Sequence, residues 1–528
     1  MLPGIVFLCI AYLIIITWCK AGLAYGLPQI TLFSLSLLIL LKLIINKFWL
    51  FNKGRLLLFT FTVILSLFTI SYFNPTYKWL NNKDFEQEKV FHKIQSAENI
   101  YSANVVSKRM KLLSSVNHPI DYKLAILMDL KNSFENNIFS DDDGVLISLL
   151  NRLEYLIQNE NLGFLPKITI KSSNLLPDFY FFIFSLLLGY IVHNSITNPS
   201  QIRIICYVIA INGAVLATIG ILQKTDLLIF RSGYEILGIW SAPEPRYCFS
   251  SFTYKNHWSA YSLTSLSSIF YLIYTSAQRS VFSNINPKEL NFLFILLIPL
   301  LVSIPISGSR SGLLLLILLL IAVILIAISL YPYISNTKRY IYISITSIGI
   351  IFSSFMFLLN NNNISKEMLN VTSIQIKAIS EGKLPYRLLL WQDAWNTYQA
   401  SHLFGHGYNS YSAINPKYQS VESKRERLKG IEAAHKPYIP LTAHAHNDYL
   451  EWMCEWGFSV IVIFVIPLLI YHFAVIFGRY PTEAKILCLG SLIFFVYCVV
   501  DFPTRTPACL SLVSINSGLV FANIKSYS

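Results

Sequence analysis

Twelve apolar runs, each long enough to cross a lipid bilayer as a helix, dominate this chain. A membrane-spanning α-helix needs about 20 apolar residues, because each residue adds about 1.5 Å across a hydrocarbon core of about 30 Å. We therefore expect an all-α polytopic membrane protein with about 12 transmembrane helices, at 3–19, 28–46, 56–73, 177–195, 202–222, 256–275, 291–307, 312–331, 340–359, 456–477, 484–500 and 507–523.

The composition excludes several classes of protein. Only 13% of the 528 residues are charged, against roughly 25% in soluble domains, which excludes a soluble enzyme on a single anchor and a disordered chain. The eight cysteines include no CxxC pair, so neither a zinc site nor a disulfide framework is indicated. A net charge of +13 would favour nucleic acid as the partner of a soluble protein. In a membrane protein it is typical of basic cytoplasmic loops, so we predict a bilayer and no nucleic acid as partners.

Basic clusters in the short loops predict the orientation of the chain. Two long polar segments, 74–176 and 360–455, fall on the outer side if the N-terminus is cytoplasmic. The turns at 307–312 and 501–506 and the connection 223–254 then share that outer face. In this orientation the inner loops carry the basic residues, as the positive-inside bias requires: Lys47, Lys53 and Arg55; Arg279 and Lys288; Lys338 and Arg339; Arg479 and Lys485.

Alternation of apolar and polar segments predicts five regions. The insert is predicted to be helical, because 120–139 has an amphipathic period and the acidic residues at 141–143 precede an apolar run. The charge-rich stretch 422–427 is typical of a solvated helix face. The regions are N-terminal transmembrane helices at 1–73, an outer helical insert at 74–176, central transmembrane helices at 177–359, a large outer loop at 360–455 and C-terminal transmembrane helices at 456–528.

The densest group of polar residues at a predicted membrane surface ends the second outer loop. His446 directly precedes a predicted helix, and a helix N-terminus favours the neutral imidazole that a general base needs. Asn447 and Glu451 are four residues apart, so they share a face of that helix and are predicted substrate ligands. Two alternatives stay open: His444 and His446 bind a metal with Asp448, or the segment is a plain interfacial loop.

Further polar residues lie where other outer loops meet the spans. Lys255 and Asn256 offer donors to a phosphate or a sugar, and the rings beside His257 can stack on a sugar. Alternatively, Lys255 and His257 extend their polar ends to the membrane surface. Asp501 and Arg505 lie on either side of Pro503 in the last outer turn, where they either pair with each other or line the site.

Two arginines are the predicted anion ligands. Arg310 lies in a turn rich in glycine and serine, and a guanidinium with hydroxyls and backbone N–H groups suits an oxyanion such as phosphate. The alternative is that Arg310 caps helix carbonyls. Arg387 opens a helix whose aromatic stripe is more typical of packing than of a sugar platform: Trp391, Trp395 and Tyr398.

The order of these pieces resembles the O-antigen ligase and O-antigen polymerase superfamily of bacterial envelope glycan enzymes. Tyr254 stands where one of the family motifs commonly has Asn, and the insert 74–176 is not typical of the family. Five motifs carry the resemblance: Gly220-Ile-Leu-Gln-Lys224, Phe252-Thr-Tyr-Lys-Asn256-His257-Trp-Ser-Ala260-Tyr261, Ser307-Gly-Ser-Arg310-Ser-Gly312, Arg387 to Trp391 followed by Gly405-x-Gly407, and Ala445-His446-Asn447-Asp448-Tyr449-Leu450 followed by Glu455-x-Gly457.

The resemblance implies a GT-C-like fold in the bacterial cytoplasmic (inner) membrane, with two helical periplasmic loops. It implies transfer of a glycan from a polyprenyl-diphosphate-linked donor to a lipid A core, glycan or protein acceptor, with inversion and without a metal or other cofactor. A departing diphosphate carries negative charge, which Arg310, Arg387 and Lys255 can stabilise. His446 is the best candidate base for the acceptor hydroxyl.

Two other classes of function stay open. The first is a membrane transporter of a small anion or glycan, since twelve spans is a common transporter count. Against it, the polar groups lie in the outer loops and charges within the spans are scarce. The second is a non-catalytic component of an envelope polysaccharide assembly complex.

Overall fold

The computed structural model describes two compact, mainly helical units. Unit 1 consists of Met1–Phe61, Phe181–Ile374 and Leu468–Ser528, and unit 2 of Thr62–Tyr180 and Gln375–Pro467. Residues described are 3–24, 26–45, 55–74, 120–135, 147, 151, 165–168, 175–196, 198–225, 235–242, 247–282, 287–329, 373, 380, 385–401, 403–424, 426 and 442–527.

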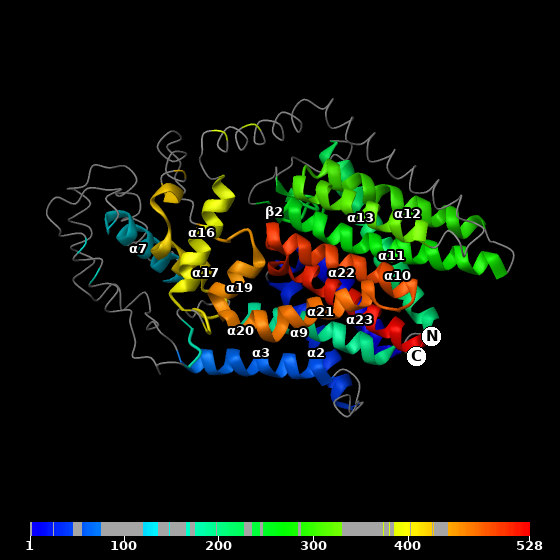
Figure 1. Ribbon diagram of the computed structural model, residues 1–528, viewed down its shortest axis with the longest axis horizontal. Helices are drawn as coiled ribbons and strands as arrows, with labels where there is room; N and C mark the ends of the chain where they lie inside the picture. Colours follow the sequence, from blue (N-terminus) through cyan, green and yellow to red (C-terminus); the bar gives the residue numbers. More distant parts are fainter. Residues whose placement is uncertain are drawn as a thin grey trace. The chain divides into compact units, whose positions relative to one another are not determined.

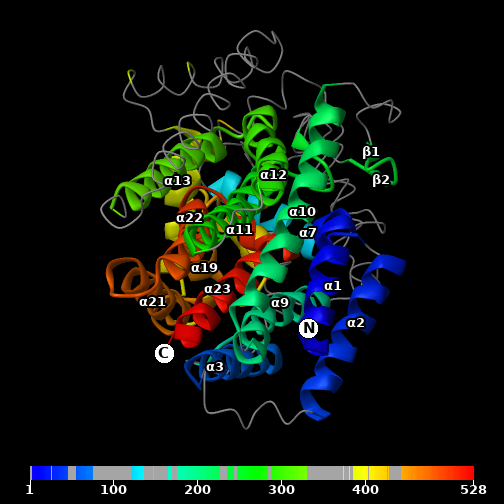
Figure 2. The same ribbon diagram turned by 90° about the vertical axis from the view of Figure 1, so that its right-hand side faces the viewer.

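Unit 1 is built from long apolar helices (Figures 1 and 2). They are α1 (Gly4–Trp18), α2 (Leu27–Ile45), α10 (Pro199–Lys224), α11 (Lys255–Phe282), α12 (Pro287–Ile306), α13 (Arg310–Ser329), α22 (Thr482–Val500) and α23 (Pro507–Tyr527). The 3-10 turns η1 (Lys20–Gly22) and η6 (Pro503–Arg505) precede α2 and α23, and a short hairpin pairs β1 (Glu235–Ile236) with β2 (Trp240–Ser241). Helix α11 is central, because it packs against α10, α12, α13, α22 and α23.

Helix α11 differs from the other long helices in its many buried serines. The hydroxyl of Ser265 donates to the carbonyl of Tyr261 at 2.9 Å, which satisfies it within the helix. Because other helices of unit 1 enclose α11, it needs no continuous apolar surface. The fully or almost fully buried serines are Ser259, Ser262, Ser265, Ser267 and Ser268.

Helices of the described residues coincide with every predicted span except 340–359, which lies outside those residues. Seven of them are long and apolar enough to cross a membrane by length and composition. They are Leu27–Ile44, Leu175–Ser195, Pro199–Lys224, Lys288–Ile306, Phe458–Phe477, Thr482–Val500 and Pro507–Ile524. The chain is therefore a mostly helical multi-pass membrane protein, whereas the count of about 12 spans stays a prediction.

Unit 2 contains the shorter helices of the two long polar segments. The amphipathic helix predicted at 120–139 is present as α7 (Ile120–Glu135). Helix α17 (Tyr411–Tyr418) packs against both α7 and α16 (Tyr386–Gln399), and α16 packs against α19 (Asp448–Trp456), as Figure 1 shows. After α19 follow α20 (Phe458–Val460) and a π-helical turn (Ile461–Val465), while α3 (Arg55–Phe73), α9 (Leu175–Ser195) and α21 (Ile466–Phe477) each contribute residues to both units.

Candidate functional site

The loop that carries the predicted base joins helix α19 through an N-cap. Asn447 has an extended backbone (φ −161°, ψ 105°), and its Oδ1 accepts the N–H of Leu450 at 3.1 Å. Helix α19 therefore begins at Asp448, one residue later than predicted, and Asn447 is its cap rather than part of its face. Its role as a substrate ligand stays a prediction.

Glu451 reaches back from α19 to this loop. Its side chain is 1% exposed, and its Oε1 lies 2.9 Å from Nδ1 of His444. Its Oε2 accepts the backbone N–H of Ala445, also at 2.9 Å. The glutamate predicted as a sugar ligand thus makes two contacts within the protein, and spacing within the helix gives no sign of either.

His446 lies in a left-handed backbone conformation with φ +52°. Its carbonyl accepts the indole N–H of Trp391 in α16 at 3.3 Å. Trp391 lies one helical turn beyond Arg387 in α16. This hydrogen bond therefore connects the loop that contains His446 to the helix that begins beside Arg387. Both His446 and Arg387 are half-buried.

The turn at 404–408, which contains the Gly405-x-Gly407 motif, fixes α16 against α19. The N–H of His406 donates to the carbonyl of Cys454 at 2.8 Å, and the His406 Nε2 lies 3.0 Å from the carbonyl of Thr397. Burial lowers the pKa of His406 to about 4, so this imidazole is neutral at ordinary pH. A Cβ at Gly457 would lie 2.2 Å from the carbonyl oxygen of Leu403, so only glycine fits where α19 ends.

In unit 1 the start of α11 meets the last turn before α23. The side-chain amide of Asn256 donates to Oδ2 of Asp501, whose Oδ1 accepts the N–H of Phe502 at 3.0 Å. Nδ1 of His257 lies 2.6 Å from Oγ1 of Thr506. Two predicted site segments far apart in the sequence therefore form one corner of unit 1.

The remaining predicted residues of this corner lie on the same elements. Lys255 places its ammonium 5.5 Å from the centre of the Tyr247 ring, within the range of a cation–π contact. Arg505 ends the 3-10 turn η6 and is half-buried. The ring of Tyr254 stacks on that of Phe502, which adds an aromatic contact between the two segments.

The turn before Arg310 is tied to this corner. Ser309 Oγ and the hydroxyl of Tyr497, in the last turn of α22 before Asp501, lie 2.9 Å apart. A Cβ at Gly312 would come within 2.6 Å of the Ser259 side chain, so glycine allows α13 to approach the first turn of α11 closely. Arg310 itself is the first residue of α13 and is half-buried.

Potential metal ligands do not gather in the part of the chain that the structure describes. Among those residues, no three histidine, cysteine, aspartate or glutamate side chains lie close enough together to hold a metal ion. Asp448 is fully buried in the first turn of α19.

A family model described as O-antigen ligase matches residues 294–465. Residues 294–465 are similar to the O-antigen ligase family. The match confirms the resemblance to the O-antigen ligase and polymerase superfamily and points to glycan transfer in envelope polysaccharide assembly. Neither the comparison with curated proteins nor the comparison with solved structures gives a match.

The matched segment contains only some of the predicted site residues. Arg310, Arg387 and His446 lie within the matched segment 294–465, whereas Asn256 and Asp501 lie outside it. Within unit 1, the contact of Ser309 with Tyr497 joins the matched segment to the corner that holds the two outside residues.

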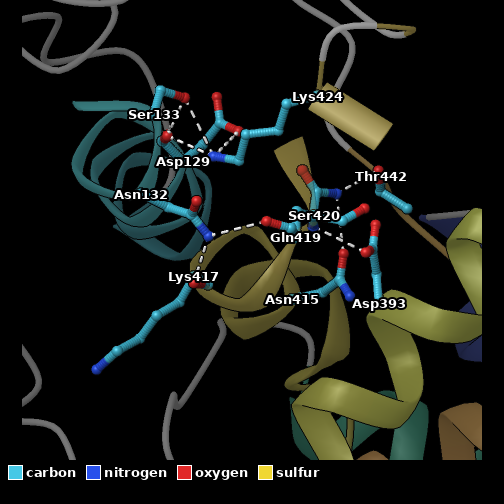
Figure 3. Close-up of polar contacts among 10 residues, drawn as sticks. All are labelled: Asp129, Asn132, Ser133, Asp393, Asn415, Lys417, Gln419, Ser420, Lys424 and Thr442. Atoms are coloured by element: carbon cyan, nitrogen blue, oxygen red, sulfur yellow. Dashed lines mark hydrogen bonds and ion pairs between the residues drawn. The ribbon is translucent and has the colours of Figure 1, made fainter. Parts of the chain in front are cut away.

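A buried polar network inside the matched segment runs through 415–424 (Figure 3). The amide of Gln419 donates to Oδ1 of Asn415 at 2.9 Å and to Oγ1 of Thr442 at 2.7 Å. Oδ1 of Asp393, in α16, accepts the N–H of Ser420 at 2.8 Å. Thr442, two residues before His444, is therefore hydrogen-bonded to Gln419, and the next residue, Ser420, contacts Asp393 of α16.

Lys424 is an exception to the solvated helix face predicted at 422–427, in which Glu422 and Glu426 are exposed. Its side chain is 0% exposed and its ammonium lies 3.1 Å from Oδ1 of Asp129, which is also 0% exposed. The same ammonium donates to Ser133 at 3.1 Å (Figure 3). Helix α7 thus packs on the matched segment 294–465 through a buried ion pair, which compensates for the loss of water around Lys424.

We expect Lys424→Ala to lower the free energy of unfolding of unit 2 by about 3–5 kcal/mol, because it leaves the buried Asp129 carboxylate without its ammonium. Urea unfolding of the purified protein, followed by tryptophan fluorescence, measures the change. The control is Glu135→Ala, which removes a half-exposed pair with Lys131 on the same helix and should cost under about 1 kcal/mol. Equal effects of the two substitutions would contradict the assignment.

Proposed function

We propose that this protein transfers a glycan from a polyprenyl diphosphate carrier to an acceptor hydroxyl. The single observation that carries the proposal is the O-antigen ligase match over 294–465. The acceptor oxygen attacks the anomeric carbon, the bond from that carbon to the diphosphate oxygen breaks, and the hydroxyl proton leaves. Attack from the face opposite the diphosphate inverts the anomeric centre.

Positive side chains stabilise the charge that develops on the departing diphosphate. Arg310 and Arg387 are the guanidinium groups assigned to this role, and Lys255 adds an ammonium. A planar guanidinium can donate two parallel hydrogen bonds to a phosphate, which gives orientation as well as charge. In this proposal the reaction is independent of metal ions, because these cations supply the stabilisation.

His446 accepts the proton of the acceptor hydroxyl. Its backbone is held through the indole N–H of Trp391, which favours a fixed imidazole position. The residues assigned to contacts with the saccharide or diphosphate are Asn256, His257, Asn447, Asp501 and Arg505. The contact of Asn256 with Asp501 supports a shared role for the α11 start and the last turn.

The reaction takes place at the periplasmic face of the bacterial cytoplasmic membrane. The basic inner loops and the polar outer segments of the sequence support this orientation. A lipid-linked donor also explains why Lys255 and Arg310 lie at the starts of long helices of unit 1. The acceptor is a lipid A core, another glycan or a protein.

Transfer by the purified protein in lipid nanodiscs tests the proposal. With a synthetic polyprenyl-diphosphate saccharide and each acceptor class in turn, we expect product and released carrier diphosphate, at the same rate with and without EDTA. A rate that EDTA abolishes and a divalent cation restores would overturn metal independence and would make His444, His446 and Asp448 candidate ligands. Absence of transfer to all three acceptor classes, in a protein that still inserts and folds, would contradict the enzymatic assignment.

A further inference from the structure

Glu451 is held too firmly inside the protein to serve chiefly as a sugar ligand. We infer that it is a positioning residue: its buried carboxylate fixes the loop of His444 and Ala445 and thereby sets the orientation of His446. This inference rests on the proposed function, since it assigns Glu451 to the placement of the proposed base.

Both carboxylate oxygens of Glu451 are already engaged at hydrogen-bond distance. One lies 2.9 Å from Nδ1 of His444, and the other accepts the N–H of Ala445 at 2.9 Å. The side chain is 1% exposed, so little of it faces solvent or a sugar. A carboxylate buried to this degree is stable only where donors replace its water, and these two donors do so.

His446 depends on such anchoring because its backbone is strained. The backbone of His446, at φ +52°, lies in the left-handed region, which residues other than glycine adopt only where the surroundings enforce it. Glu451 holds the residue before it, Trp391 holds its carbonyl, and Asn447 after it caps α19. Of these three anchors, only Glu451 is a charged group.

The contact with Glu451 also orients the imidazole ring of His444. Nδ1 of His444 lies 2.9 Å from the carboxylate, which orients this nitrogen towards Glu451. The His444 side chain is 32% exposed, unlike Glu451. The partly exposed imidazole of His444 is therefore held by the buried carboxylate of Glu451. Removal of the imidazole leaves the second anchor, the bond of Glu451 to Ala445, in place.

Steady-state kinetics of Glu451 variants test the inference. Glu451→Ala removes both anchors, and misplacement of a reacting group by about 1 Å can cost about 100-fold in rate. We expect kcat per folded molecule to fall about 10- to 100-fold while the KM for donor and acceptor stays within about threefold. Glu451→Gln can still accept from Ala445 and donate to Nδ1 of His444, so it should recover most of kcat. His444→Ala keeps the bond to Ala445 and should lose less than Glu451→Ala.

A packing control separates positioning from general stability. Cys454→Ala removes a fully buried side chain of the same helix, from the cluster that includes Ala445, and leaves both contacts of Glu451 in place. It should lower the melting temperature and leave kcat per folded molecule unchanged. The inference is overturned if Glu451→Ala raises KM with kcat unchanged, if it behaves like Cys454→Ala, or if Glu451→Gln is as inactive as Glu451→Ala.

A spectroscopic readout keeps the inference distinct from the proposed function. In protein with ¹⁵N-labelled histidine, the Nδ1 resonance of His444 should report a proton donated to a carboxylate, and both Glu451→Ala and Glu451→Gln should shift it. An unchanged Nδ1 resonance in both variants would overturn the inference even in an active enzyme. If the wild-type protein shows the expected Nδ1 resonance of His444 but transfers no glycan, that result overturns the proposed function and not the contact between Glu451 and His444.

Discussion

Replacing His446 with alanine is expected to lower kcat for glycan transfer by about 10²–10⁴-fold, the contribution of a positioned general base. Donor binding should be retained, because the contacts to the diphosphate are assigned to the arginines. The measurement is product formation by the purified protein with donor and acceptor saturating, together with a separate titration of donor binding.

His444→Ala is the matched control, because it removes an imidazole two residues away in the same loop. We expect a loss of less than about tenfold, since Glu451 still holds the backbone of Ala445. An inactive His444 variant beside an active His446 variant would move the base by two residues. If both variants stayed active, neither imidazole would accept the proton, and Asp448 would be tested next.

The alanine variants of Arg310 and Arg387 are each expected to lose about 10²–10³-fold in kcat, the usual cost of removing one group that stabilises transition-state charge. Lysine at either position should recover only part of the rate, because an ammonium cannot donate two parallel hydrogen bonds to a phosphate. Initial rates of carrier diphosphate release measure both effects.

Arg479→Ala serves as the control for loss of an arginine. Arg479 is exposed in the connection between α21 and α22, away from the elements that carry the predicted site. Its replacement should leave the transfer rate within about twofold, as expected of a surface position. Full activity in both the Arg310 and Arg387 variants would leave the assignment to the diphosphate without support.

The helices of this protein were predictable because their signal is local. An apolar run of about 20 residues has few alternatives to a helix, whatever surrounds it. Helix α11 extends from Lys255 to Phe282, seven residues beyond the predicted span 256–275. Its serine-rich surface is compatible with membrane depth only because other helices enclose it, which hydropathy alone cannot report.

The pairing of site residues was less predictable, because it depends on contacts between distant segments. Spacing within a helix suggested a shared face for Asn447 and Glu451, whereas the structure makes one a cap and directs the other to His444. The left-handed backbone of His446 has no sequence signal of the kind that glycine provides. Motif order did identify the segments that unit 1 brings together at Asn256 and Asp501.

The ion pair between Asp129 and Lys424 joins positions 295 residues apart, one of them in an insert that is not typical of the superfamily. Substitution of Asp129 alone would leave the buried Lys424 ammonium without its counter-charge, so we expect the two charges to change together during evolution. Homologues that keep the insert but have a neutral residue at the position of Asp129 should therefore carry a neutral residue at the position of Lys424. The presence of both charges in a genome sequence would mark the subgroup of relatives that share this architecture.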